Sequence, residues 1–271
     1  MKKIKQTINQ LALVIVLLLL AAACKKYVDP ALVFEEDSGP NYEKDRKVLL
    51  VVIDGLSGPE LQKYVPHQMQ KMMEHAKYTL DGFSDSDTGD AATWTTILSG
   101  KSSQYHGVWG NDFDESEPDD DDIHDHEGAD QATGFITVYQ RLLESGKVLK
   151  SFSVTPWVDL DQQLFNLSHE NGAVESDEAA KEKAVDRIKH GENALAFAVV
   201  NFRGVNEAGL ANGFSMDSPP YKAALDVVDG YLAELLAAVE ARQNYAQENW
   251  LVIITSNHGG LANSYGGASF E

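Results

Sequence analysis

The chain has 271 residues, of which 43% are hydrophobic and 9% aromatic, enough to build the core of one α/β domain with or without an insertion. Its 22 basic and 42 acidic residues give a formal net charge of -20. Such a surface repels phosphate backbones, so we expect no nucleic acid partner. It also repels free anionic substrates unless a bound metal reverses the field locally.

The N-terminus has the layout of a bacterial export signal. Three lysines stand within the first five residues, an apolar stretch follows at Leu11–Leu20, and three alanines precede Cys24, the only cysteine. We therefore predict a signal peptide over residues 1–23 and, because the cleavage region resembles a lipobox, a lipid on Cys24. The alternative is an uncleaved membrane anchor, for which the stretch is short.

Residues 24–46 are polar and are predicted to tether a domain of residues 47–271 to a membrane through the lipid on Cys24. This arrangement would place the protein in the bacterial cell envelope, lipid-anchored and facing the periplasm or the cell surface. After cleavage no second cysteine is available for a disulfide, so we expect the core to supply the stability of the domain.

The stretch Leu49–Leu56 predicts the central strand of the domain. It reads LLVVIDGL, an apolar run that is too short for a helix and ends in an Asp-Gly pair. A run without polar alternation suits a strand that is buried on both faces of a parallel sheet. Asp54 follows the run at its carboxyl end, where ligands bind in such sheets. The simpler alternative is that Asp54 only begins a turn.

Apolar strands alternate with amphipathic helices along the rest of the chain. The predicted strands are Val48–Ile53, Leu149–Val154, Ala194–Phe202 and Trp250–Ser256. The predicted helices are Pro59–Tyr78, Thr133–Ser145, Ser176–His190 and Pro219–Glu240, with Thr93–Leu98 as a helix or an extended turn and Gly204–Gly213 as a loop. This alternation indicates an α/β fold with a mainly parallel sheet sandwiched by helices.

An acidic insertion occupies Asn111–Asp130. It contains the run Asp119–Asp122, with His124 and His126 shortly after it. A solvated loop that is held open by its own charge accounts for this composition. The alternative is a segment that binds cations or a basic partner.

Four motifs in order resemble the alkaline phosphatase superfamily, and within it the type I phosphodiesterase/nucleotide pyrophosphatase branch found in lipoproteins of Bacteroidetes. They are VVIDG at Val51–Gly55, TWTTILSGKSSQYHGV at Thr93–Val108, YKAALDVVDGYLAELLAAV at Tyr221–Val239 and WLVIITSNHGG at Trp250–Gly260. The resemblance runs from Lys47 to the C-terminus. It implies an alkaline-phosphatase-like domain in which two metal ions, usually zinc, stabilise a displacement at phosphorus. The last residues fall where family members continue into further strands, so we expect a C-terminally truncated domain.

The resemblance assigns roles to particular positions of this chain. Asp54 is retained at the metal-binding position after the first strand, and Asn257-His258 stands where the family has Asp-His. Asp90 occupies the position of the catalytic nucleophile, which is normally Ser or Thr. Thr88 could replace it only if the register of the loop shifted. Asp54, Asp90, Asn257 and His258 are thus the candidate ligands of one metal site.

Three further family ligand positions are substituted, by Asn206, Leu210 and Tyr265. These residues are poor ligands for zinc, so the resemblance implies that the second metal site is absent. The oxygen-rich set at the first site favours one divalent cation, with Mg²⁺, Mn²⁺ or Ca²⁺ preferred to Zn²⁺. The alternative is a hydrogen-bonded polar cluster without metal. In that case Asp54 and Asp90 would repel each other, and one would have a raised pKa or move apart.

Two hypotheses for the function follow. In the first, the protein is an exported lipoprotein with a phosphodiesterase-like domain whose two-metal centre has eroded and whose activity is weak or lost. In the second, it is an active hydrolase of small phosphate or sulfate esters that uses one remaining metal held by Asp54, Asp90 and His258. The substrate cannot be read from the residues between the motifs.

Overall fold

The computed structural model describes residues 44–113, 135–147, 149–261 and 264–265. The predicted signal peptide, Cys24 and nearly all of the predicted tether lie outside these residues, as does most of the acidic insertion. Within the described residues, no helix combines the length and the apolar character needed to span a bilayer.

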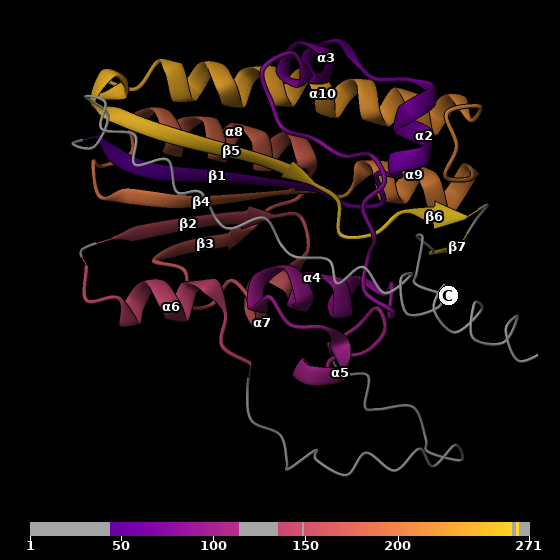
Figure 1. Cartoon of the computed structure of the whole chain (residues 1–271), viewed down its shortest axis with the longest axis horizontal. Helices are drawn as coiled ribbons and strands as arrows, with labels where there is room; N and C mark the ends of the chain where they lie inside the picture. The colour runs from indigo at the N-terminus through magenta and orange to yellow at the C-terminus, as the bar shows by residue number, and fades with distance from the viewer. Residues whose placement is uncertain (1–43, 114–134, 148, 262–263, 266–271) are drawn as a thin grey trace, which may run out of the picture. The chain divides into compact units, whose positions relative to one another are not determined.

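Five parallel strands form the central sheet (Figure 1). In spatial order they are β3 (Glu170–Ala173), β2 (Lys150–Thr155), β4 (Leu195–Phe202), β1 (Asp45–Ile53) and β5 (Glu248–Thr255). The four strands predicted from apolar runs are confirmed, as is their parallel arrangement. The strand β3 was not predicted, because the segment ENGA lacks the β-branched and aromatic residues typical of strands.

The start of the domain needs a correction. The predicted tether extends to residue 46 and the predicted strand begins at Val48, whereas β1 begins at Asp45. Asp45 and Arg46 pair in parallel register with Glu248 and Asn249 of β5. Backbone pairing extends a strand past its apolar run, since the polar residues at its start lie at the amino edge of the sheet and need no burial.

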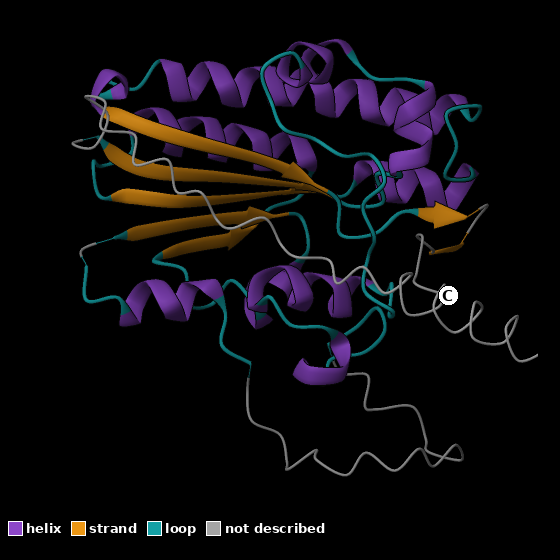
Figure 2. Cartoon of the chain, viewed as in Figure 1, coloured by secondary structure: helices purple, strands orange, loops and turns teal. Residues whose placement is uncertain are grey.

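Helices cover both faces of the sheet (Figure 2). One face packs against α8 (Asp177–His190), α9 (Gly204–Asn212) and α10 (Pro219–Glu240). The other packs against α4 (Asp90–Ser99), α6 (Val138–Glu144) and α7 (Val158–Gln163). The remaining described elements are short: α2 (Gly58–Lys63), α3 (His67–Met73), α5 (Ser103–His106), the 3-10 helix η2 (Tyr245–Gln247), β6 (Gly260–Leu261) and β7 (Ser264–Tyr265).

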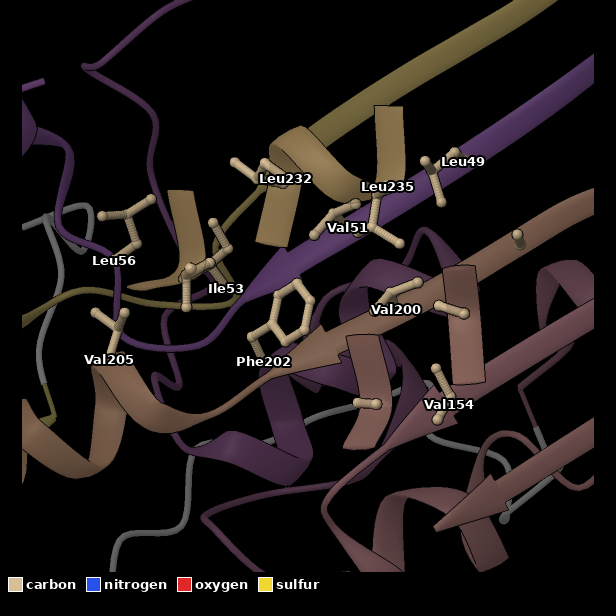
Figure 3. Close-up of a cluster of buried hydrophobic side chains, with 14 of the residues drawn as sticks. Leu49, Val51, Ile53, Leu56, Val154, Val200, Phe202, Val205, Leu232 and Leu235 are labelled. Atoms are coloured by element: carbon tan, nitrogen blue, oxygen red, sulfur yellow. The ribbon is translucent and has the colours of Figure 1, made fainter. Parts of the chain in front are cut away.

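The side chains of β1 alternate between the two cores. Leu49, Val51 and Ile53 lie in the core under α8 and α10, where Figure 3 shows them beside side chains of β4 and α10. Leu50 and Val52 lie in the core under α4 and α7. A strand that is buried on both faces has no polar alternation, and this is why LLVVI identified it. Asp54 directly follows Ile53, the last residue of this buried strand, and therefore lies at the carboxyl edge of the sheet.

The predicted helix over Pro59–Tyr78 is interrupted in the structure. It consists of α2 and α3, because Pro66 has no backbone N–H and stands in extended conformation immediately before α3. The carboxylate of Asp229 on α10 accepts hydrogen bonds from the backbone N–H groups of Gln68 and Met69 at 2.8 and 2.9 Å. This contact satisfies the start of α3 and fastens it to α10.

Candidate functional site

Three adjacent strands deliver polar residues to the carboxyl edge of the sheet. Asp54 follows β1, Arg203 follows β4, and Asn257 and His258 follow β5. Since β1 pairs with both β4 and β5, these strand ends lie side by side. Asp54, Asn257 and His258 therefore stand at neighbouring strand ends on one edge of the sheet.

The helix α4 brings Asp90 to the same place. Gly89 precedes α4 and lies against the backbone of Gly110 so closely that a Cβ atom on Gly89 would collide with it. The carboxylate of Asp87 holds this approach by accepting hydrogen bonds from the N–H groups of Gly89 and Gly110, both at 2.8 Å. Asp90 is consequently the first residue of α4, and Thr88 stays in the preceding loop.

Both carboxylate oxygens of Asp90 accept hydrogen bonds. Oδ1 lies 2.9 Å from Nδ2 of Asn257 and 2.8 Å from Nε2 of His258, and Oδ2 lies 2.9 Å from Nη2 of Arg203. Burial of Asp90 opposes its ionisation, but the hydrogen bonds from His258 and Asn257 and the charge of Arg203 outweigh burial and lower the pKa of the carboxyl group. Asp90 is therefore an ionised group inside a shell of donors.

Arg203 is a member of this site that the sequence motifs do not single out. Its guanidinium group pairs with Asp90 and lies 4.5 Å from the ring centre of Trp157. Its backbone N–H, with that of Gly204, donates to the carboxylate of Asp177 at 2.8 Å. The available signal was its place: Arg203 directly follows a buried strand, as Asp54 does.

Asp54 is fully buried beneath this cluster. Its Oδ1 accepts a hydrogen bond from the indole N–H of Trp94 at 3.1 Å, while its Oδ2 has no hydrogen-bond partner among the described residues. Burial, followed by repulsion from Asp90, raises the pKa of Asp54 well above its usual value.

The side-chain amide of Asn257 is engaged at both ends within the protein. Its Oδ1 accepts hydrogen bonds from the N–H groups of Gly55 at 3.2 Å and His258 at 2.8 Å. On the His258 ring, Nδ1 lies 2.6 Å from the carbonyl oxygen of Gly259, and Nε2 contacts Asp90. Both ring nitrogens of His258 are therefore engaged with oxygen atoms of the protein.

Asn206, Leu210 and Tyr265, which the resemblance puts at ligand positions of the family, lie on two elements, α9 and β7. Asn206 is fully buried in α9, and neither of its side-chain amide atoms has a hydrogen-bond partner among the described residues. Leu210 of α9 packs against the hydrophobic core. Tyr265 belongs to β7, whose backbone pairs with β6, and its side chain lies outside the description.

The segment Gly204–Gly213 was predicted as a loop, and this is wrong. It forms the helix α9, because the carboxylate of Asp177 satisfies the N–H groups at its start and Val205 and Gly209 give it a buried face. The short segment VNEAGLANG contains two glycines, which obscure the helical period in the sequence.

The ring of Phe214 fills the space beside Asn206. A Cβ atom added to Gly209 or Gly260 would collide with this ring, and one added to Gly55 would lie 2.9 Å from the ring and 2.8 Å from Cα of Asn206. Phe214 is 3% exposed, so an apolar side chain occupies this part of the edge. No motif indicated Phe214.

The donors in this arrangement do not fit a divalent ion. Among the described residues, no group of three or more His, Cys, Asp or Glu side chains is placed to hold a metal. The polar atoms without partners near Asn206 and Asp54 are one carboxylate oxygen and one amide, whereas zinc takes four ligands and calcium six or more. Asp54, Asp90, Asn257 and His258 are thus gathered at one edge, but their lone pairs are largely committed to one another.

Comparison with known proteins was made by family, by sequence and by fold. The family described as type I phosphodiesterase/nucleotide pyrophosphatase matches residues 48–268. A search of curated proteins finds no significant sequence match. Solved structures with a similar fold include an inactive variant of murine ectonucleotide pyrophosphatase/phosphodiesterase 5 in complex with AMP. It has a TM-score of 0.61 and 19% identity over 79% of this chain and 57% of that chain.

Two bacterial structures have similar folds as well. One is a putative sulfatase from Bacteroides thetaiotaomicron, with a TM-score of 0.57 and 11% identity over 82% of this chain and 60% of that chain. The other is the periplasmic domain of the phosphoethanolamine transferase EptC from Escherichia coli in complex with Zn, with a TM-score of 0.50 and 12% identity over 81% of this chain and 65% of that chain. The chain therefore spans less than two thirds of the length of these structures.

Proposed function

Because the chain belongs to the type I phosphodiesterase/nucleotide pyrophosphatase family, we propose that it is a lipoprotein of the bacterial cell envelope whose hydrolase-like domain has lost the two-metal centre of that family. The domain itself is a phosphodiesterase-like member of the alkaline phosphatase superfamily. In the proposed function it has little or no hydrolase activity and binds, without cleaving, a small phosphate or sulfate ester. The lipid on Cys24 holds it at a membrane.

The observation that carries this proposal is that both carboxylate oxygens of Asp90 already accept hydrogen bonds within the protein. A nucleophile needs a lone pair directed at the phosphorus atom, and it needs a nearby charge that stabilises the transition state. Asp90 directs its oxygens at Arg203, Asn257 and His258, which are 2.8 to 2.9 Å away. Its side chain is 2% exposed, so a phosphate ester cannot reach it without displacing these donors.

The ligand class is proposed from similar structures. The murine phosphodiesterase 5 variant was solved in complex with AMP, which is a phosphate ester. Another similar structure is a putative sulfatase, a name that refers to sulfate esters. In this chain the guanidinium of Arg203 stands at the carboxyl edge of the sheet, and its side chain is 17% exposed. Arginine recognises phosphate and sulfate oxygens through paired N–H donors.

The second candidate function is hydrolysis with one metal, held by Asp54, Asp90 and His258. The observation that favours it is the buried Oδ2 of Asp54, which has no hydrogen-bond partner among the described residues. A cation bound there would satisfy this oxygen and relieve the repulsion between Asp54 and Asp90. It would have to compete with Arg203 for Asp90.

An assay of turnover separates the two functions. The purified protein is incubated with p-nitrophenyl phosphate, bis-p-nitrophenyl phosphate and p-nitrophenyl sulfate, each with added Zn²⁺, Mn²⁺ or Mg²⁺. We expect no turnover above that of a buffer control. The matched variants are Asp54→Ala and Asp186→Ala, since the Asp186 side chain is 78% exposed. Turnover that is abolished in Asp54→Ala and kept in Asp186→Ala would overturn the proposal in favour of the one-metal hydrolase.

A further inference from the structure

We propose that His106 is a pH-sensitive latch, which holds residues 107–111 against the start of α4 while its ring is neutral and releases them when the ring takes up a proton. Residues 107–111 are called the strap below. They follow α5 directly and lie over the end of α4 that begins with Asp90. This device is independent of whether the domain binds or cleaves an ester.

The strap is fastened to the start of α4 by hydrogen bonds. The Ala92 N–H donates to the carbonyl oxygen of Gly110 at 3.2 Å, and the Asp90 N–H donates to Oδ1 of Asn111 at 3.2 Å. The Gly110 N–H in turn donates to Oδ2 of Asp87 at 2.8 Å. The first N–H groups of a helix have no acceptor within it, so the strap supplies acceptors that the start of α4 would otherwise lack.

The ring of His106 holds the strap in one protonation state only. Its Nδ1 accepts a hydrogen bond from the N–H of Val108 at 3.1 Å, so this nitrogen carries no proton. Its Nε2 lies 3.0 Å from Oγ1 of Thr96, whose hydroxyl donates to Oδ2 of Asp85 at 2.7 Å. Because that hydroxyl proton is committed to Asp85, the proton of the neutral ring lies on Nε2. A second proton, on Nδ1, would set two donors against each other and break the bond to Val108.

The surroundings of His106 favour the neutral ring. The side chain is buried, and burial lowers its pKa below the usual 6.5. The charges of Asp85 and Asp87, on the loop before α4, act in the opposite sense and are outweighed. From α4 the ring meets the uncharged Thr96 hydroxyl, and from the segment before α6 it meets the Phe135 ring, with ring centres 5.9 Å apart. The closed strap and the protonated ring disfavour each other, so acid shifts the strap towards release.

The strap is also poised to move. It contains two glycines in left-handed conformation, Gly107 with φ of 72° and Gly110 with φ of 70°. A Cβ atom on Gly107 would meet nothing within 4 Å, so packing does not restrict this end of the strap. Between the two glycines, the indole Nε1 of Trp109 is buried and has no hydrogen-bond partner among the described residues. Release would bring this N–H group to water, which offsets part of the contacts that are lost.

Hydrogen–deuterium exchange of the full chain, followed by mass spectrometry from about pH 8 to about pH 5, measures the latch. Exchange at each pH is expressed as protection relative to the intrinsic rate of the same amides. We expect the protection of residues 107–111 to fall by about tenfold towards acid, as befits a hydrogen bond that gives way to two opposed donors. The protection of α8 and α10 should stay constant over the same range.

Non-titrating variants and a surface control show whether His106 is responsible. In His106→Asn the side-chain amide can accept from the N–H two residues on, as Asn does in turns, so the strap should stay protected over the whole range. His75→Asn changes an exposed histidine and should keep the pH response of the unaltered protein. If His106→Asn does not fold, His106→Gln replaces it, since its longer amide reaches towards Thr96 and does not titrate either.

Any of three results would overturn the latch. The first is a strap whose protection is the same at both ends of the pH range in the unaltered protein. The second is a loss of protection that persists in the His106 variant. The third is a parallel loss in α8 and α10, which would mean that acid unfolds the domain rather than releasing the strap. None of these results bears on the proposed function, which the turnover assay tests separately.

Discussion

The Nη2 atom of Arg203 lies 2.9 Å from the Oδ2 atom of Asp90, although the two residues are 113 positions apart in the sequence. This contact joins the end of β4 to the start of α4 across the carboxyl edge of the sheet. It places a positive charge against a carboxylate that is 2% exposed. Because Asp90 is paired with Arg203, its negative charge is balanced within the protein. The properties of the site then depend on which of its carboxyl groups are ionised.

The pH dependence of stability should report the buried carboxyl group of Asp54. Burial and the charge of Asp90 raise its pKa above the usual 3.8 in the folded protein. A group of this kind contributes stability that is fully present below its unfolded pKa and is lost as the pH rises through its folded pKa. We expect Asp54→Asn to remove this loss. Urea unfolding at a series of pH values from about 4 upwards measures it.

Asp90 should behave in the opposite way, because its pKa is lowered in the folded protein. The stability that it contributes is present above its unfolded pKa and is lost as the pH falls through its folded pKa. Asp90→Asn should therefore reduce the loss of stability as the pH falls, whereas Asp54→Asn should reduce the loss of stability as the pH rises. A surface control, Asp186→Asn, should change neither side. If the unfolding free energies of Asp54→Asn and the unaltered protein depended on pH with the same slope, the raised pKa of Asp54 would be contradicted.

A second buried ion cluster lies at the amino edge of the sheet and should dominate its stability. Glu248 accepts hydrogen bonds from Arg242 at 2.7 and 2.9 Å, and Lys47 lies 3.6 Å from the same carboxylate. The Trp250 indole N–H also donates to it, at 2.8 Å. We expect Glu248→Gln to cost about 3 to 5 kcal/mol, because it leaves two buried cations without their shared anion. Urea denaturation measures this change.

The matched control for this cluster is Glu192→Gln. Glu192 pairs with Lys150 at 2.6 Å, but its side chain is 61% exposed. Exposed pairs of this kind contribute little to stability because solvent screens them, so the control should unfold almost as the unaltered protein does. If Glu248→Gln and Glu192→Gln lost similar amounts of unfolding free energy, the buried cluster would contribute no more to stability than the exposed pair.

Attachment to a membrane is tested through Cys24, which lies outside the described residues. If the predicted signal and lipid are correct, cells that express the protein with labelled palmitate should yield a labelled band in the membrane fraction. Cys24→Ala should remove the label and shift the protein out of that fraction. A protein that stays in the membrane without label after this substitution would indicate the uncleaved apolar anchor instead.

The sheet was predictable from the sequence for a physical reason. The runs that form β1, β2, β4 and β5 are apolar because each is buried on at least one face, and the 3.6-residue period of α8 and α10 reflects packing against a core. The start of α8 is fixed locally, since the Ser176 side chain accepts a hydrogen bond from the Ala179 N–H. Short elements that owe their shape to tertiary contacts, such as β3 and α9, were missed.

The site was predictable only in part. The resemblance grouped Asp54, Asp90, Asn257 and His258 as one candidate site. Asp54, Asn257 and His258 follow parallel strands, whose carboxyl ends meet at one edge, whereas Asp90 reaches that edge from the start of α4. The resemblance did not indicate Arg203, because this residue lies outside the four motifs on which the resemblance depends. Phe214 escaped notice for a similar reason: its role depends on contacts with glycines that are distant in the sequence.

The packing of Phe214 against Gly209 offers a final prediction. A Cβ atom on Gly209 would collide with the Phe214 ring, whereas Gly230 in α10 has no atom within 4 Å of such a Cβ. Alanine is favoured over glycine in a helix by about 1 kcal/mol, so Gly230→Ala should stabilise the protein. Gly209→Ala should instead destabilise it by about 1 to 3 kcal/mol, because the overpacking outweighs the gain in helix propensity.

A double-mutant cycle with Phe214→Leu separates this collision from other effects. The smaller side chain leaves room for the added methyl group, so Gly209→Ala should cost less in the Phe214→Leu background than alone, by at least about 0.5 kcal/mol. Urea denaturation of the four proteins gives this coupling, and Gly230→Ala in both backgrounds should show none. If the Gly209→Ala cost is the same in both backgrounds, then Phe214 does not fill the space beside Asn206 in the way described.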